Sequence, residues 1–191
     1  MTADYTLTLP MLTPENTDGP SRAVLERALA AVGFIPNMYK GMANAPGLLD
    51  TYLRGYDALR NSDELSPMEQ EVLFLTISRA NGCHYCMAAH SMLAAQSSGV
   101  PAEVLAALRG GLAIENERVA ALSSFAETML ETGGRPSASD VEDFLDAGYS
   151  QRAILEVILA IAVKTMSNYA NHLLHTETDA MFAGYRWPDR V

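Results

Sequence analysis

The sequence has few residues of several types, and each shortage excludes a class of protein. Only two of its 191 residues are cysteines, Cys83 and Cys86, so the chain is not a small scaffold held by several disulfides. Lysine occurs only as Lys40 and Lys164, and with a net charge of −10 the protein would repel nucleic acid. Polar or charged residues interrupt every apolar run, so we expect no membrane span.

What remains is typical of one soluble helical domain. Hydrophobic residues make up 49% of the sequence, which is enough for a packed core. The first residues lack the basic start and apolar run of a signal peptide, so we expect a cytoplasmic protein in a reducing compartment. Because no stretch has the pattern of a strand, we predict the all-α fold class, with residues 1–20 as an extended arm and residues 21–191 as a single helical domain.

Periodic apolar residues and capping signals give the expected helix boundaries. The clearest start is Ser66-Pro67-Met68-Glu69, a capping box with proline at the first helical position. A second capping box is expected at Ser139-Asp140-Val141-Glu142. The predicted helices cover residues 22–32, 46–60, 67–80, 83–99, 102–108, 117–131, 139–147 and 150–182.

Both cysteines lie in one stretch, EVLFLTISRANGCHYCMAAH, at residues 71–90. Cys83 and Cys86 are three residues apart and Cys86 and His90 four apart, the two spacings that place side chains on one face of a helix. Asn81-Gly82 breaks the preceding helix, so Cys83 falls near a helix start, where the macrodipole favours a thiolate. The imidazole one turn further on can accept the thiol proton. This pattern predicts a redox site.

Glu71 is an acid in an apolar run that continues with Val72-Leu73-Phe74-Leu75. Glu69 is explained as a helix cap, but Glu71 is not. A buried carboxylate costs several kcal/mol unless it is paired or protonated, so we expect Glu71 to have a partner or a raised pKa. If the chain turns back at Asn81-Gly82, that partner can be His90.

Two other interpretations of these residues stay open. The cysteines could be two buried apolar side chains, since cysteine is among the most buried residue types. Cys83, Cys86 and His90 are also competent zinc ligands. A structural zinc site needs a fourth ligand, however, and no second Cys-x-x-Cys or histidine pair has the usual spacing, so we expect no metal.

The order of Glu71, Cys83, Cys86 and His90 resembles the alkyl hydroperoxidase D-like (AhpD-like) family of the carboxymuconolactone decarboxylase superfamily. The surrounding residues resemble its peroxidase-related branch, namely Ser78, Asn81, Tyr85 and Ala89. The resemblance implies an AhpD-like helical bundle with internal pseudo-symmetry, and a thiol-dependent alkyl hydroperoxide reductase or disulfide reductase without metal, flavin or haem. One residue departs from the pattern, because the best-known members have a histidine where this chain has Tyr85.

The resemblance also implies a role for each site residue. Cys86 would be the attacking thiolate, His90 its activator, Glu71 a proton relay, and Cys83 the cysteine that resolves the sulfenic acid into a disulfide. From the residues alone, the helix start favours Cys83 as the nucleophile and the neighbouring histidine favours Cys86; we choose Cys86. The expected partners are a hydroperoxide and a dithiol reductant, such as lipoamide or a thioredoxin-like protein.

The same residues allow two functions other than peroxide reduction. One is decarboxylation of a muconolactone-type acid, the other activity of the superfamily, which does not need a cysteine pair. The second is a redox-regulated interaction module, in which the disulfide switches a binding surface.

A shift of the sequence by 85 residues indicates a hidden repeat. It places Glu156 on Glu71 and His175 on His90, with Asn168 and Asn171 in place of the two cysteines. We therefore predict a duplicated helical hairpin, with a Cys-x-x-Cys copy at residues 66–99 and a degenerate copy at residues 150–182. In the second copy we interpret Asn168, Asn171 and His175 as a polar stripe that serves as scaffold or lines an oligomer contact.

The predicted helix at residues 150–182 is apolar on more than one stripe, with Val157 and Ile161 lying outside the main one. A helix of this kind has to be buried on more than one side. We therefore predict a homo-oligomer, and the resemblance points to a trimer or to a hexamer made of two trimers. The alternative is a central helix buried wholly within its own domain.

Overall fold

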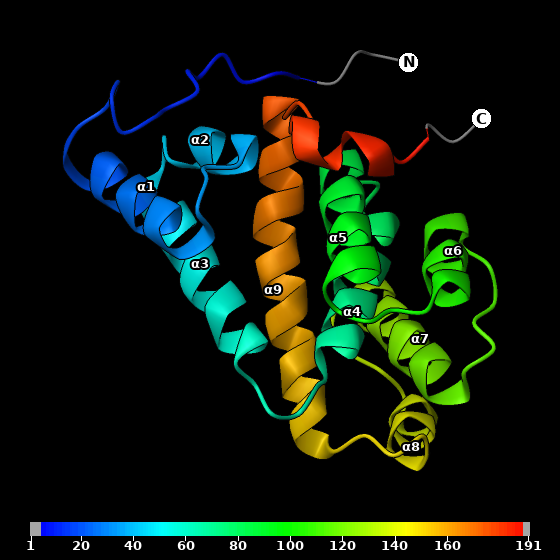
Figure 1. The fold of residues 1–191 in the computed structure, drawn as a ribbon. Coiled ribbons are helices and arrows are strands. Elements are labelled where there is room, and N and C mark those ends of the chain that lie inside the picture. Colours follow the sequence, from blue (N-terminus) through cyan, green and yellow to red (C-terminus); the bar gives the residue numbers. More distant parts are fainter. Residues whose placement is uncertain (1–4, 189–191) are drawn as a thin grey trace.

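The computed structural model describes residues 5–188, which form an all-helical bundle without a strand in that range. The all-α fold class is thus confirmed. Figure 1 shows the elements, which are α1 (Gly19–Val32), α2 (Asn37–Met42), α3 (Pro46–Arg60), α4 (Pro67–Ala80), α5 (His84–Gln96), α6 (Ala102–Gly110), α7 (Glu117–Glu131), α8 (Ala138–Asp146), α9 (Gln151–Leu174) and the 3-10 helix η1 (Ala180–Tyr185).

Helix α9 runs through the middle of the bundle (Figure 1). It packs against α2 and α3 on one side and against α4, α5 and α7 on the other. α4 and α5 form a hairpin, and α4 also packs against α7. All side chains of α4 from Glu69 to Ser78 are buried, so α4 is surrounded by other elements over most of its length. The Cys-x-x-Cys segment therefore starts next to the most enclosed helix of the bundle.

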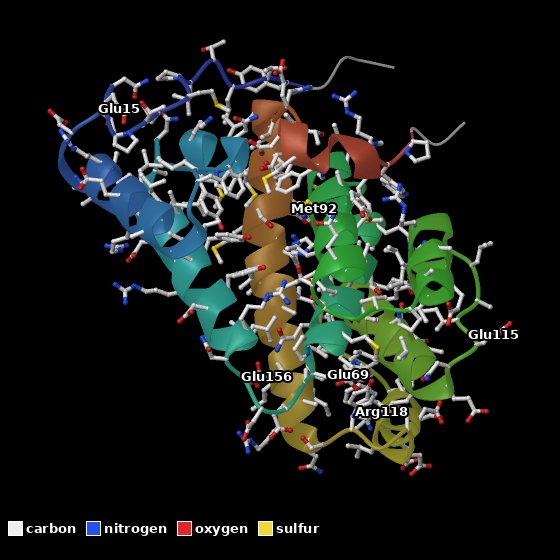
Figure 2. All side chains as sticks on the ribbon, viewed as in Figure 1. Glu15, Glu69, Met92, Glu115, Arg118 and Glu156 are labelled. Carbon is white, nitrogen blue, oxygen red and sulfur yellow. The ribbon has the colours of Figure 1, made fainter. Side chains whose placement is uncertain are left out.

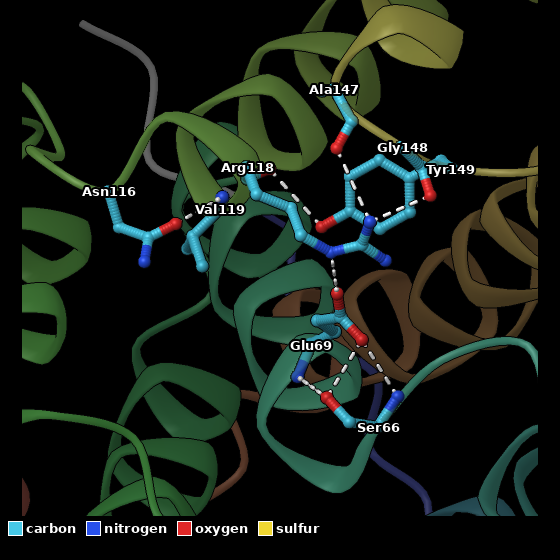
Figure 3. Close-up of polar contacts among 8 residues, drawn as sticks. All are labelled: Ser66, Glu69, Asn116, Arg118, Val119, Ala147, Gly148 and Tyr149. Atoms are coloured by element: carbon cyan, nitrogen blue, oxygen red, sulfur yellow. Dashed lines mark hydrogen bonds and ion pairs between the residues drawn. The ribbon is translucent and has the colours of Figure 1, made fainter.

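The predicted capping box at the start of α4 is present and is also a tertiary contact. Ser66 Oγ accepts a hydrogen bond from the Glu69 backbone N–H at 3.3 Å, and Glu69 Oε2 accepts one from the Ser66 N–H at 2.9 Å. Glu69 Oε1 in addition accepts from Arg118 Nε of α7 at 3.0 Å (Figure 3). Arg118 donates onward to the Gly148 carbonyl at 2.7 Å, so this cap joins the start of α4 to α7 and to the loop before α9.

Several predicted boundaries are wrong. α1 begins at Gly19 rather than at residue 22, α5 ends at Gln96 rather than at residue 99, and α2 was not among the predicted helices. The second capping box is formed by Ser137 and Asp140, not by Ser139 and Glu142, because the aspartate reaches back to the Ser137 N–H at 2.7 Å. The last long helix ends at Leu174 rather than near Phe182. His175 there adopts a left-handed conformation with φ of 45°, which terminates α9 and lets the chain return along α5 as η1.

The predicted duplicated hairpin is not confirmed. In the first copy the helix breaks at Asn81-Gly82, and Gly82 has a positive φ of 69°. The matching residues of the second copy, Met166 and Ser167, lie inside the continuous helix α9. Neither residue is favoured in the left-handed conformation that such a turn requires, so the helix continues through this position.

Part of the N-terminal arm, residues 1–4, lies outside the described residues. The described part is extended and rests on its own chain, with the Leu7 N–H donating to the Leu173 carbonyl at 2.8 Å and the Leu12 N–H to the Lys40 carbonyl at 3.1 Å. These contacts hold the arm across the ends of α2 and α9.

Helix α9 has one property that the sequence analysis did not anticipate. By length and composition alone it is apolar enough to cross a membrane, a test that the core helix of a soluble protein also passes. Its inner side is in the core, yet only 39% of its most apolar window is buried. The remainder includes Leu155 and Ile158, which are 65% and 47% exposed, so α9 keeps an apolar face open on the outside of the bundle.

We predict that Glu69→Gln lowers the free energy of unfolding by about 1–2 kcal/mol, because it weakens both the cap and the contact with Arg118. Asp140→Asn is the matched control, since Asp140 caps α8 in the same way but its side chain bonds only Ser137. This control substitution should lower the free energy of unfolding by about 1 kcal/mol or less. Urea denaturation measures both values, and equal losses would show that the contact with Arg118 adds no stability.

Candidate active site

The turn between α4 and α5 brings together two of the predicted site residues. The Cys83 N–H donates to the Ser78 carbonyl at 2.9 Å, and Gly82 supplies the positive φ that the reversal needs. α5 then packs back along α4. As a result, His90 Nδ1 lies 2.9 Å from Glu71 Oε2, as the sequence predicted.

Glu71 is fully buried and has a second partner that the sequence did not indicate. Arg60, at the end of α3, forms an ion pair with Glu71 Oε1 and also donates to the Tyr56 hydroxyl at 2.8 Å. Burial acts to raise the pKa of Glu71, but His90 and Arg60 together bring it below its usual range. The carboxylate is therefore paired and ionised, so of the two expected explanations the partner is correct and the raised pKa is wrong.

His90 is held so that one ring nitrogen is free for proton exchange. A carboxylate can only accept a hydrogen bond, so Nδ1 carries the hydrogen and Nε2 keeps its lone pair. Burial and the nearby Lys164 lower the pKa of His90, while Glu71 opposes them. The ring is therefore neutral at neutral pH and suited to accept a proton.

The two cysteines are both buried, yet they differ in acidity. Cys83 occupies the N-cap position of α5 and Cys86 lies in its first turn, and both are free thiols. Burial acts to raise the pKa of Cys86, but a hydrogen bond from Cys83 and the nearby Lys164 bring it well below its usual range. The same hydrogen bond, together with burial, raises the pKa of Cys83. The sequence left the choice of nucleophile open, and these surroundings favour the thiolate at Cys86.

Helix α9 contributes polar side chains that reach the cysteine pair. Asn171 Nδ2 lies 3.3 Å from Cys86 Sγ and 3.8 Å from Cys83 Sγ, and Ser167 Oγ lies 3.9 Å from Cys86 Sγ. Asn168 Oδ1 accepts a hydrogen bond from Asn81 Nδ2 at 2.9 Å, which ties α9 to the turn before Cys83.

One interpretation of this stripe needs correction. Asn168 and Asn171 face the Cys-x-x-Cys segment of their own chain and do not line an oligomer contact. Glu156 and His175, which the shift of 85 residues places on Glu71 and His90, lie about 28 Å apart along α9 at 1.5 Å of helix per residue and do not form a pair. The sequence contained a signal for the contact between α9 and the cysteine pair, because polar residues at positions 164, 167, 168 and 171 share one face of an otherwise apolar helix.

The two cysteines face different spaces. Cys86, His90 and Lys164 line a cavity of about 320 Å³ that we call the aromatic cavity. Its other walls are mainly aromatic and methionine side chains, among them Met92, which Figure 2 labels on α5. The aromatic residues of the wall include Phe34, Tyr39, Tyr52, Tyr56, Tyr85 and Phe182. Cys83 lines a separate and more open cleft of about 810 Å³, which we call the outer cleft.

Tyr85 stands between the two spaces and lines both. Its hydroxyl donates to Asp179 Oδ2 at 2.5 Å, and its ring is perpendicular to that of Phe182, with 5.9 Å between the ring centres. Burial, followed by this hydrogen bond to Asp179, raises the pKa of Tyr85. Tyr85 thus links α5 to the start of η1 beside the aromatic cavity and keeps its own proton.

No three His, Cys, Asp or Glu side chains within residues 5–188 are grouped as ligands for a metal ion. Cys86 and His90 lie one turn apart on α5 and Cys83 precedes its first turn, but Glu71 holds one nitrogen of the imidazole.

Comparison with known proteins agrees with this arrangement. Residues 46–128, from α3 into α7, match the sequence model of the carboxymuconolactone decarboxylase family. A search of curated protein sequences found no match.

Solved structures share the fold over nearly the whole chain. A peroxidase-related protein from Ralstonia eutropha JMP134, described as an alkylhydroperoxidase AhpD core, aligns with a TM-score of 0.78 and 21% identity over 94% of this chain and 96% of its own. A peroxidase-related protein from Silicibacter sp. TM1040 aligns with a TM-score of 0.76 and 23% identity over 94% of each chain. The debrominase Bmp8 in complex with 2,3,4-tribromopyrrole aligns with a TM-score of 0.70 and 19% identity over 85% of this chain and 87% of its own. The chain therefore has the AhpD-like fold, and its residues 46–128 are similar to the carboxymuconolactone decarboxylase family.

Proposed function

We propose that this protein is a thiol-dependent peroxidase that reduces organic hydroperoxides through Cys86 and Cys83. One observation carries the proposal: Cys86 lines an apolar cavity beside a second cysteine and a buried Glu–His pair. A low-pKa cysteine next to a resolving cysteine is the usual arrangement of a redox-active thiol.

In the first step, Cys86, whose proton has already passed through His90 Nε2 to solvent, attacks the terminal oxygen of the hydroperoxide as a thiolate. The S–O bond forms as the O–O bond breaks, and the departing alkoxide leaves as the alcohol by taking one proton from His90, which receives it at Nε2 from solvent. Glu71 keeps the ring oriented and stabilises the imidazolium that forms between these events. Cys86 is then a sulfenic acid.

In the second step, the Cys83 thiol attacks the Cys86 sulfenic acid, and a disulfide and one water molecule form. A dithiol, such as lipoamide or a thioredoxin-like protein, then attacks Cys83 and returns both cysteines to thiols. Cys83 is the reasonable target, because it lines the outer cleft whereas Cys86 lines the aromatic cavity. This cycle requires a reducing compartment such as the cytoplasm.

We also propose that the protein is a homo-oligomer, a trimer or a hexamer, in which a neighbour covers the exposed apolar side of α9. In one chain this side leaves Leu155, Ile158, Tyr169 and Leu173 between 45% and 65% exposed. This apolar face extends along most of α9. An apolar helix face of this length is usually buried against another surface.

The redox prediction is that one equivalent of cumene hydroperoxide makes both cysteines unavailable to alkylation in denaturant. Mass spectrometry should find a Cys83–Cys86 disulfide. In Cys83→Ser the oxidised product should instead be a sulfenic acid on Cys86 that dimedone traps, whereas Cys86→Ser should not react. If both thiols of the unmodified chain stay open to alkylation, the protein is not a peroxidase.

The same assay separates the rival functions. Turnover of a lactone without thiol would identify a decarboxylase, and a disulfide that forms without catalytic turnover would identify a redox-regulated interaction module. Loss of bromide from 2,3,4-tribromopyrrole with a dithiol would point to the reaction of the debrominase that shares this fold.

We predict that Glu71→Gln lowers the rate of hydroperoxide reduction about 100-fold or more, because His90 loses the carboxylate that orients and stabilises it. The amide also removes a group that raises the pKa of His90, so the imidazole titration measured by NMR should move to lower pH. Glu69→Gln, two residues earlier on α4, is the control and should keep its full rate. An unchanged rate in Glu71→Gln would remove the proton relay from the mechanism.

Light scattering at micromolar concentration should give a mass well above the 20.6 kDa of one chain. Leu155→Glu on α9 should lower that mass, because it places a charge on the apolar face. Leu112→Glu is the matched control, since Leu112 is 69% exposed but lies in the loop after α6. A mass near that of one chain for the unmodified protein would disprove the assembly.

A further inference from the structure

Lys164 is a buried cation that the proposed reaction has not yet used. Its side chain on α9 is fully buried, and its Nζ has no hydrogen-bond acceptor among residues 5–188. It lines the aromatic cavity together with Cys86 and His90, with Nζ 5.4 Å from the centre of the Phe74 ring. Lysine is almost never fully buried unless it is paired, because removing an ammonium group from water is costly. The position therefore calls for an anion inside the cavity.

The other buried charges do not supply that anion. Glu71 is already shared between Arg60 and His90. The phenols that line the cavity from α2, α3 and α5 are neutral, because burial raises the pKa of each; they are Tyr39, Tyr52, Tyr56 and Tyr85. Cys83 is likewise held as a thiol. Among the described groups that line the cavity, Cys86 alone is left to carry a negative charge opposite Lys164.

The charge count gives the same answer. Arg60 and Glu71 cancel, and His90 is neutral in the resting site. With Cys86 as a thiol, the site would hold one unmatched positive charge. With Cys86 as a thiolate, the buried charges sum to zero.

The placement of Lys164 on α9 supports this pairing. Ser167 and Asn171 follow it at three and seven residues, on the same helix face, and both contact Cys86 Sγ. The face of α9 turned toward this sulfur therefore holds a hydroxyl, an amide donor and an ammonium group.

We propose that Lys164 is the counter-ion of the Cys86 thiolate and thereby makes Cys86, rather than Cys83, the nucleophile of this protein. Its part in peroxide reduction rests on the proposed function, whereas its effect on the acidity of Cys86 does not. During the attack the negative charge moves from Cys86 Sγ to the departing oxygen within the same cavity, and Lys164 attracts it there until His90 delivers the proton. Lys164 itself exchanges no proton in this scheme.

The test is a titration of the Cys86 thiolate by its ultraviolet absorbance, with Cys86→Ser as the blank in each background. Lys164→Met keeps most of the side-chain volume and removes the charge, so the midpoint should rise by about 1–3 pH units. Lys164→Arg keeps a cation and should retain a low midpoint. Lys40→Met is the matched control, because Lys40 is the other lysine of the chain and bonds Asn37 away from the cavity; it should leave the midpoint unchanged.

The thermal midpoint reports whether a variant folds, the thiolate titration reports the effect of Lys164 on Cys86, and hydroperoxide turnover reports the proposed function. In Lys164→Met the Cys86 thiolate can take up a proton, so no unpaired charge stays buried and the thermal midpoint should remain close to that of the unmodified protein. If that variant does not fold, Lys164→Gln takes its place in the same titration. An unchanged thiolate midpoint in the folded neutral variant overturns the proposal. A raised midpoint in a protein that reduces no hydroperoxide supports the counter-ion and refutes the proposed function instead.

Discussion

The carboxylate of Glu71 is ionised in the middle of an apolar helix, and the arrangement of three helices depends on how that charge is shared. Arg60 reaches it from the end of α3, and His90 reaches it from α5. Breaking a buried ion pair by removing one partner costs about 3–5 kcal/mol, far more than a pair on the surface contributes. The pairing therefore fixes α3, α4 and α5 relative to one another at the place where the imidazole must point into the aromatic cavity.

Sequence reasoning found the parts of this site that are encoded locally. The spacing of Cys83, Cys86 and His90 predicted one face of a helix, and the capping box at Ser66 predicted where the helix of Glu71 begins. Glu71 was recognisable because it was the acid that no cap explained. Each of these inferences uses residues within about one or two helical turns, where geometry follows from spacing alone.

The parts that sequence reasoning missed come from distant segments. Arg60, Lys164 and Asn171 reach the site only through the packing of α3 and α9, and no local spacing records that packing. The shift of 85 residues put Asn171 opposite a cysteine, but it led to the wrong interpretation, because a single unbroken helix replaced the expected hairpin. The end of α9 was placed too late for a related reason: His175 adopts a left-handed conformation that is uncommon for a non-glycine residue and that composition does not reveal.

The contribution of α9 also has a consequence for the order in which the protein is made. Ribosomes complete α4 and α5, with both cysteines, well before they reach Lys164 and Asn171. Until α9 has been synthesised and has packed, Cys86 lacks the ammonium and the amide that stabilise its anion, and an ordinary thiol reacts slowly with oxidants because the thiolate is the reactive form. The nascent chain thus carries both cysteines as weakly reactive thiols, and Cys86 becomes reactive only when α9 has packed and folding is complete.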